Sequence, residues 1–174
     1  MTWKTAWPSH ALTESRRRLA DLRNELDHLP DTSSPEVEQA ISRFLVIRCC
    51  GHIEFTFEET FCSLAEAQAS PGVASYVRSG FFRGSNPHPS RLTGTLDRLN
   101  KSISNDLSGF LSQDDQRVHR ELGFLIDRRN RIAHGQSENV SRRKALDLAS
   151  IALEIGDWIT EHLDPRSSDG LNSI

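Results

Sequence analysis

Apolar side chains recur every three or four residues along most of this chain, and this spacing restricts its fold more than any other feature. The longest such run extends from residue 35 to about residue 68. A repeat close to 3.6 residues places the apolar side chains on one face of a helix. The alternation of period two that marks half-buried strands is almost absent. The pattern predicts an all-α protein, an antiparallel helical bundle of five to six helices around one core.

Helix boundaries can be located from capping residues. Pro30 ends the first apolar pattern, and residues 34–35 and 70–71 are both Ser-Pro. Serine is favoured at the N-cap and proline at the first helical position, so these pairs predict the starts of a long helix and a short one. Gly51 is a potential weak point inside the long helix.

The second half of the chain predicts three further helical segments. The apolar spacing over residues 92–110 indicates one continuous helix, which follows a long loop at residues 80–90. Residues 114–115 are both Asp and suit the start of the next helix, which runs toward Gly135. Ser141 is the expected N-cap of the last helix.

The length and composition agree with one globular domain. The chain has 174 residues, of which 36% are hydrophobic, enough for a core and too apolar for a disordered chain. We expect a single domain over residues 1–165 and a flexible C-terminal tail over 166–174. No run approaches the roughly 20 apolar residues of a membrane helix, and the first residues lack the apolar centre of a secretory signal. These features predict a cytoplasmic protein with no membrane association.

Three cysteines, Cys49, Cys50 and Cys62, lie within the apolar pattern of the long helix. Buried free thiols in a reducing compartment are the simplest interpretation. Together with His52 the cysteines match no zinc-binding spacing, so no metal site is expected.

The net charge of −3 means that any nucleic-acid binding must be local. Two basic clusters stand out, residues 16–18 and the arginines of residues 128–131 with their continuation at 142–144. For residues 16–18 we expect a solvated helix face.

The segment 127–135, Asp-Arg-Arg-Asn-Arg-Ile-Ala-His-Gly, contains residue types suited to phosphate binding and proton transfer. Arginine presents a planar set of donors that matches phosphate oxygens, and histidine exchanges protons near neutrality. Arg129, Asn130 and His134 together fit metal-free cleavage of RNA, in which one group removes the 2′-OH proton and another protonates the leaving 5′-oxygen. At a helix C-terminus, the dipole favours the protonated form of His134.

Helix geometry limits this hypothesis. Arg129 and His134 are five residues apart, so on a straight helix they point about 140° apart. They converge only if the helix unwinds before His134, or if a second protomer supplies its own copy. Alternatively, the segment is only a helix end, with cations on the dipole and Gly135 after the last turn.

The arrangement Arg129-Asn130-x-x-x-His134 resembles the R-x4-6-H motif of HEPN domains, and residues 132–135 complete the form RNxIAHG. The loop of residues 84–87 (Gly-Ser-Asn-Pro) and the helix after it resemble the RiboL-PSP-HEPN branch. The resemblance spans roughly residues 35–163.

This resemblance implies a helical bundle that forms a homodimer with the motif at the subunit interface. It also implies a metal-independent endoribonuclease without cofactors, of the kind found in toxin–antitoxin and defence systems, with RNA as the substrate and an antitoxin or other protein as a partner. By position, Arg129 and His134 are the catalytic pair and Asn130 assists them.

The same family supplies further candidates and an alternative. Arg128 and Arg131 are candidate substrate-binding residues beside the pair. Some branches add an acidic residue from an earlier helix, for which Glu54 is the candidate here, the alternative being that Glu54 is only one of several exposed carboxylates. Other members have lost catalysis, so a non-catalytic HEPN dimer that binds RNA or a partner protein is the alternative function.

Overall fold

The computed structural model describes residues 6–80, 86–136 and 138–166, and these residues form α-helices and no strand. The helices follow one another as α1 (His10–Asp27), α2 (Pro35–Gln68), α3 (Pro71–Gly80), α4 (Pro89–Leu99), α5 (Lys101–Ala133) and α6 (Arg142–His162). The all-α bundle predicted from the sequence is confirmed, with six helices in the described ranges. The predicted tail lies outside these ranges except for Arg166.

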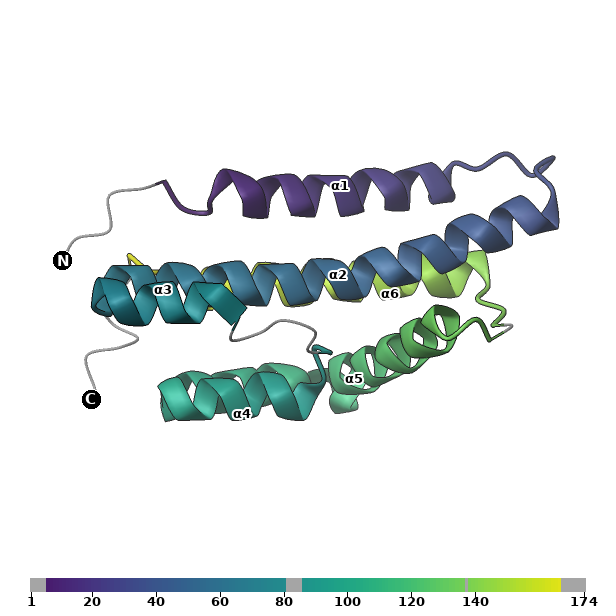
Figure 1. Cartoon of the computed structure of the whole chain (residues 1–174). Coiled ribbons are helices and arrows are strands. Elements are labelled where there is room, and N and C mark those ends of the chain that lie inside the picture. Colours follow the sequence, from purple (N-terminus) through teal and green to yellow (C-terminus); the bar gives the residue numbers. More distant parts are fainter. Residues whose placement is uncertain (1–5, 81–85, 137, 167–174) are drawn as a thin grey trace.

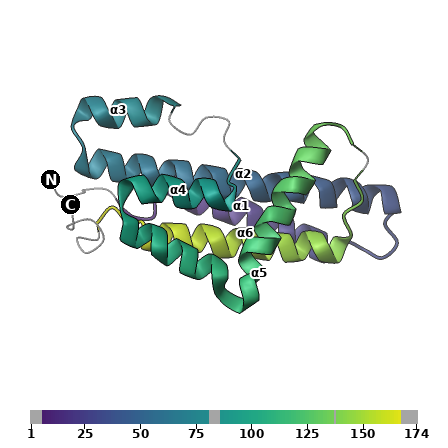
Figure 2. The same cartoon turned by 90° about the horizontal axis from the view of Figure 1, so that it is seen from below.

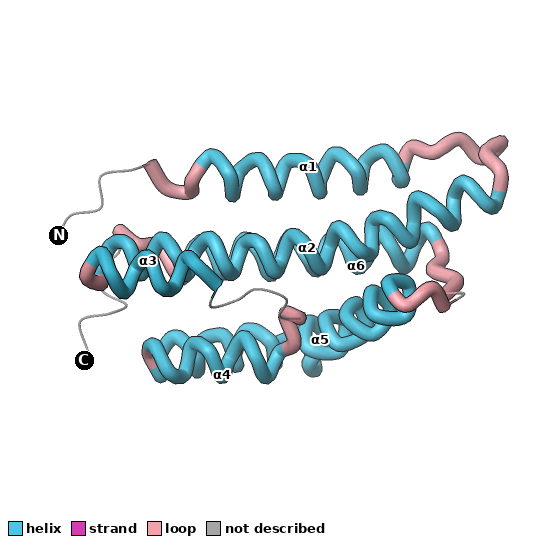
Figure 3. The backbone as a smooth tube through the Cα atoms, viewed as in Figure 1, coloured by secondary structure: helices cyan, strands magenta, loops and turns pink. Residues whose placement is uncertain are grey.

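Three helices, α1, α2 and α6, lie side by side along the length of the bundle (Figure 1). α1 runs in the opposite direction to α2 and α6, which lie beside it (Figure 1). Short loops join α1 to α2 and α5 to α6 at the same end of the bundle (Figure 3). Leucine and isoleucine dominate the interior. The largest fully buried side chains are Leu19, Leu26, Leu45, Ile53, Leu96, Leu107, Leu122, Leu125, Leu148, Ile155, Ile159 and Leu163.

Two of the predicted capping residues, Ser34 and Ser141, act as expected. The Ser34 side chain accepts a hydrogen bond from the Val37 N–H at 3.3 Å, and Ser141 accepts one from the Lys144 N–H at 3.3 Å. Each serine satisfies a backbone N–H that has no partner within its helix. The predicted weak point at Gly51 leaves no break, because α2 is continuous through this residue.

The continuous helix predicted for residues 92–110 was wrong. Its apolar pattern spans two helices, because α4 ends at Leu99 and α5 begins at Lys101. Asn100 between them has extended backbone angles, and its side chain accepts from the Ser102 N–H at 2.8 Å. An asparagine that caps the next helix in this way separates two helices whose apolar faces continue the same spacing.

The break predicted near residues 114–115 occurs as a kink inside α5. Asp114, Asp115 and Gln116 all have positive φ angles, of 49°, 54° and 60°. Arg117 lies beside the kink and contacts Asp114 and Glu154 of α6 at 3.4 and 3.1 Å. α5 therefore consists of two arms, and the second crosses toward α2 (Figure 2). This crossing brings Arg129, near the end of the second arm, to within 3.8 Å of Glu54 on α2.

Within the described part of the chain, no helix is long and apolar enough to cross a membrane.

Candidate functional site

The predicted motif occupies the last turn of α5, which is regular to its end. The His134 N–H donates to the Asn130 carbonyl at 3.0 Å, as expected for an intact helical turn. Gly135 has a φ angle of 71°, and the Gln136 N–H reaches back to the Arg131 carbonyl at 3.0 Å. These bonds form a Schellman motif, which needs a residue such as glycine in the left-handed conformation. The helix does not unwind before His134.

Arg129 is held between two helices. Its Nη2 lies 3.8 Å from a carboxylate oxygen of Glu54 on α2, and its Nη1 donates to Oδ1 of Asn130 at 3.2 Å. The Asn86 amide, from the loop before α4, donates to the same oxygen at 3.3 Å. Only a third of the Arg129 side chain is exposed, at 33%. The crossing of α2 and α5 therefore brings Glu54 to the adjacent motif residues Arg129 and Asn130.

The pKa of Glu54 is raised, chiefly because burial penalises its charged form. The positive charge of Arg129 lowers this pKa, and the negative charge of Glu58 raises it further. Burial therefore outweighs the attraction of the arginine. A carboxyl group with a raised pKa beside a cation is suited to exchange a proton or to orient the guanidinium.

The cysteines of α2 take no visible part in this site. All three are free and buried, as the sequence predicted. Cys50 lies one turn before Glu54, and burial raises the pKa of its thiol to about 12. It is therefore a neutral packing group and a poor nucleophile. Among the described residues, no cluster of three or more His, Cys, Asp or Glu side chains is arranged to hold a metal ion.

Arg128 and Arg131, the candidate substrate-binding residues, already have carboxylate partners. Both pair with Glu138, a residue that is only 7% exposed in the loop after α5. Arg131 also contacts Asp127 at 3.1 Å, and the Arg128 guanidinium lies 4.6 Å from the centre of the Phe124 ring. Hydrogen bonds from Arg131 and then Arg128 lower the pKa of Glu138, so it is ionised at neutral pH.

The structure does not bring His134 to Arg129 within one chain. His134 is exposed at the end of a regular helix, and residues five positions apart on such a helix point about 140° apart. The sequence allowed Arg129 and His134 to meet either by unwinding of the helix or through a second protomer. The regular helix rules out the first way, so only a second protomer could bring them together.

Two residues of this region had no assigned role in the sequence analysis. Asn86 belonged only to a loop used for the family resemblance, and Glu138 was not considered. Nothing in the local spacing marks Glu138, because its contacts depend on how the chain turns after α5. Asn86 precedes Pro87, a pairing typical of a turn, but its contact with Asn130 depends on tertiary structure.

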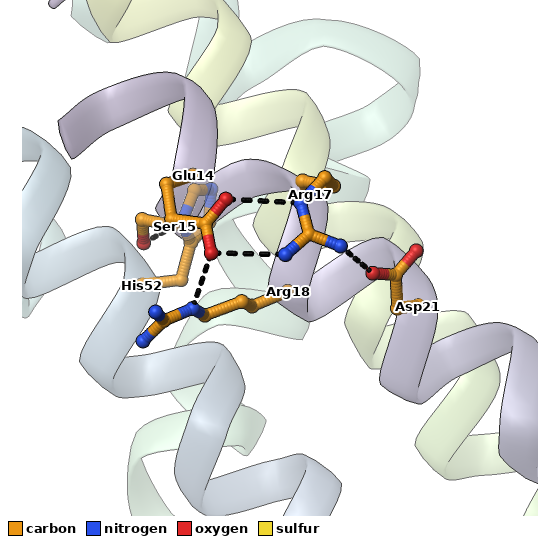
Figure 4. Close-up of polar contacts among 6 residues, drawn as sticks. All are labelled: Glu14, Ser15, Arg17, Arg18, Asp21 and His52. Atoms are coloured by element: carbon orange, nitrogen blue, oxygen red, sulfur yellow. Dashed lines mark hydrogen bonds and ion pairs between the residues drawn. The ribbon is translucent and has the colours of Figure 1, made fainter. Parts of the chain in front are cut away.

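A second polar cluster lies along α1, and beside it Ser15 of α1 contacts His52 of α2 at 2.9 Å (Figure 4). Glu14 accepts hydrogen bonds from Arg17 and Arg18, which lower its pKa to about 2, and Arg17 also bonds to Asp21 at 2.6 Å. The exposed Arg17 and Arg18 side chains confirm a solvated helix face, while Arg16 of the same basic cluster pairs with Asp157 of α6 at 2.7 Å.

Comparison with known proteins decides the family. The family model described as RiboL-PSP-HEPN matches residues 13–164, nearly the whole described chain. The chain belongs to the RiboL-PSP-HEPN family. The match confirms the resemblance and extends it toward the N-terminus, so that most of α1 belongs to the HEPN domain. Arg129 and Asn130 at the end of α5, and His134 directly after it, therefore lie within the matched residues.

Among curated proteins, this HEPN chain is similar to yeast proteins named pheromone-processing carboxypeptidase KEX1. It is 27% identical to the protein of Candida dubliniensis over 130 residues, and 28% identical to that of Candida albicans over the same length. Each match covers 72% of this chain but only 19% and 18% of the relative. The chain thus spans about a fifth of the length of these relatives. No solved structure matches this HEPN chain.

Proposed function

We propose that this HEPN protein is a metal-independent endoribonuclease that acts as a symmetric dimer. The observation that carries the proposal is the position of Arg129, which is half-buried between Glu54 and Asn130 on the last turn of α5. A guanidinium oriented by an acid and an amide is suited to bind a phosphodiester and to stabilise charge on it. HEPN domains commonly bind RNA and form dimers, and both properties agree with this site.

The proposed reaction uses the RNA itself as the source of the nucleophile. The 2′-oxygen attacks the adjacent phosphorus as its proton leaves to a general base, and the bond from phosphorus to the 5′-oxygen breaks. A general acid protonates that 5′-oxygen, so the products are a 2′,3′-cyclic phosphate and a 5′-hydroxyl. His134 acts as the acid or the base, Glu54 assists, and Arg129 stabilises the phosphorane between them.

Asn130 has a defined part in this scheme. Its Oδ1 accepts from Arg129 and Asn86, which leaves the two N–H donors of its amide for a phosphate oxygen. Arg128 and Arg131 contribute to RNA binding at the edge of the site, and less than Arg129 does, because each shares the charge of Glu138.

A second protomer completes the proposed site, because Arg129 and His134 diverge on one helix. A surface suited to a second copy lies on α2. Val37, Phe44 and Phe55 are between 37% and 53% exposed, and their spacing of seven and eleven residues puts them on one stripe of the helix. Val37 and Phe44 belong to the apolar run of residues 35–68, yet both side chains are exposed. Phe55 directly follows Glu54, so a copy that covers this stripe lies close to Arg129.

A non-catalytic dimer that binds RNA is the second candidate function. The separation of Arg129 from His134 within one chain favours it, because a binding module needs the arginine without the histidine. A role as a toxin or defence effector, with an antitoxin or other partner, stays a prediction from the family.

Cleavage of labelled RNA in the presence of EDTA separates these functions. We expect the wild type to cut RNA with chelator present, to leave DNA intact and to release 2′,3′-cyclic phosphate ends. His134→Ala should lower the rate on the order of 10²–10⁴-fold, the usual worth of a positioned acid–base group. His119→Ala is the matched control, because His119 is another exposed histidine of α5, and it should cut like the wild type.

Three results would contradict the proposed metal-independent cleavage of RNA by His134 and Arg129. Cleavage that stops with EDTA and returns with Mg²⁺ would replace this mechanism by a metal-dependent one. His134→Ala cutting as fast as the wild type would remove His134 from catalysis. RNA binding without any cleavage would favour the non-catalytic dimer.

A further inference from the structure

The loop between α5 and α6 contains a buried carboxylate that faces the motif helix. Glu138 is 7% exposed, although it lies in a connecting segment of the chain. One carboxylate oxygen pairs with Arg128, and the other accepts a hydrogen bond from Arg131 at 3.0 Å. A charged side chain is seldom buried unless its partners compensate the loss of water. Here two arginines of one helix provide that compensation.

These two ion pairs fix the turn that carries His134. Arg128 and Arg131 are three residues apart, so they lie on the same side of α5. Between them and Glu138 the chain reverses at His134 and Gly135, and Val140, which follows Glu138 closely, is buried in the core. The turn is therefore held on both sides, by the end of the helix before it and by the Glu138 pairs after it.

The same ion pairs neutralise some arginines of the motif more than others. Glu138 and Asp127 carry two negative charges, which formally balance the charges of Arg128 and Arg131. The carboxylate nearest to Arg129, Glu54, is farther away at 3.8 Å and has a raised pKa. Of the three neighbouring arginines, Arg129 is thus the least neutralised by its surroundings.

We infer that Glu138 is a positioning residue: it holds the His134 turn in place and, by occupying Arg128 and Arg131, directs an RNA phosphate to Arg129. This inference rests on the proposed function. Glu138 itself touches neither the RNA nor the reacting atoms. It acts through the histidine that it positions and through the two cations that it keeps from competing for the phosphate.

Glu138→Gln tests the inference in two separate measurements. The first is affinity for a fluorescently labelled single-stranded RNA oligonucleotide across a series of salt concentrations. The variant releases up to two cations, so we expect tighter binding at low salt and a steeper dependence of log K on log salt, by about 0.7 for each additional RNA phosphate that a released arginine neutralises. The second is cleavage of the same RNA, in which kcat should fall about tenfold or more while KM falls. Loss of stability alone would not tighten RNA binding.

Two further variants keep the test decisive. Asp127→Asn makes the same change of charge at an exposed position of the cluster, and it should leave kcat within about twofold of the wild type. Arg131→Ala leaves Glu138 paired with Arg128. Because Glu138 and Asp127 already neutralise Arg131, RNA affinity should fall much less than it does in Arg129→Ala. This second variant decides the question if Glu138→Gln does not fold.

The outcomes separate this inference from the proposed function. Glu138→Gln with unchanged affinity, salt dependence and kcat would overturn the inference while the wild type still cuts RNA. A loss of RNA affinity in Arg131→Ala as large as that in Arg129→Ala would overturn it as well. A wild type that binds RNA without cutting it would contradict the proposed endoribonuclease activity. The affinity measurements alone would then decide the role of Glu138.

Discussion

Arg129 donates a hydrogen bond from Nη1 to Oδ1 of Asn130 at 3.2 Å. Arginine has only donors, so the Asn130 atom that faces it must be the oxygen. This contact fixes the orientation of the amide and sends its N–H donors away from Arg129. Asn130 thus accepts through its oxygen and keeps its N–H donors for another partner.

Asn130→Asp tests this arrangement. The carboxylate keeps an acceptor for Arg129 and Asn86, but it replaces the N–H donors with an oxygen that repels phosphate. Since the loss of one well-placed donor typically costs about 10²–10³-fold, we expect kcat/KM for RNA to fall by at least that order. Asn24→Asp adds the same charge on α1 and should cut normally. Activity of Asn130→Asp close to that of the wild type would show that the amide donors are not used.

Gly156 of α6 lies against the buried His52 side chain of α2. A Cβ atom at this position would lie 2.5 Å from Nε2 of His52, a residue that is 4% exposed. Gly156→Ala should therefore destabilise the protein by on the order of 2 kcal/mol, as overpacking of a core does. Thermal unfolding measures this loss. Gly109→Ala is the matched control, because a Cβ there meets nothing within 4 Å, and alanine should stabilise the helix by up to about 1 kcal/mol.

The pH dependence of stability should report the burial of His52. Its Nδ1 lies 2.9 Å from Oγ of Ser15, and burial is the main reason that its pKa is lowered from 6.5 to about 4. The folded protein thus binds a proton less readily than the unfolded chain. Stability is lost as the pH falls from about 6.5 toward 4, by on the order of 3 kcal/mol over this window.

Urea unfolding of the wild type and of His52→Gln at several pH values measures the contribution of His52 to the free energy of unfolding. The difference between the two should shrink as the pH falls through the window, since the variant has no imidazole to protonate. NMR titration of the His52 ring gives an independent reading. A His52 pKa at or above 6.5 in the folded protein would contradict the prediction.

The helices were predictable where local chemistry decides them. Ser34 and Ser141 start helices because their hydroxyl groups satisfy backbone donors, a property that the sequence displays directly. Asn100 has the same role, but the apolar spacing on its two sides continues without interruption and conceals the break. The last turn of α5 was predictable for the same local reason, since Gly135 can adopt the positive φ that ends a helix.

The site was predictable only in part. Arg129, Asn130 and His134 could be chosen because they are neighbours in sequence and form a known motif. The contact of Glu54 with Arg129 joins residues 75 positions apart, and it depends on the kink in α5 that turns its second arm toward α2. The pairing of Glu138 with Arg128 and Arg131 depends on the path of a loop, for which side-chain spacing gives no guide.

The central claim is that one active centre combines Arg129 of one protomer with His134 of another. Arg129→Ala and His134→Ala should each be inactive alone, because each lacks one half of every site. In a mixed dimer of the two variants, one site lacks both groups, and the other has the native arginine and the native histidine.

Mixing the two inactive variants under conditions that allow subunit exchange is the most direct test. With random exchange half of the dimers are mixed and one of their two sites is native, so an equal mixture should recover about a quarter of the wild-type rate of RNA cleavage. A mixture that remains as inactive as its components, while sedimentation shows exchanged dimers, would contradict the claim.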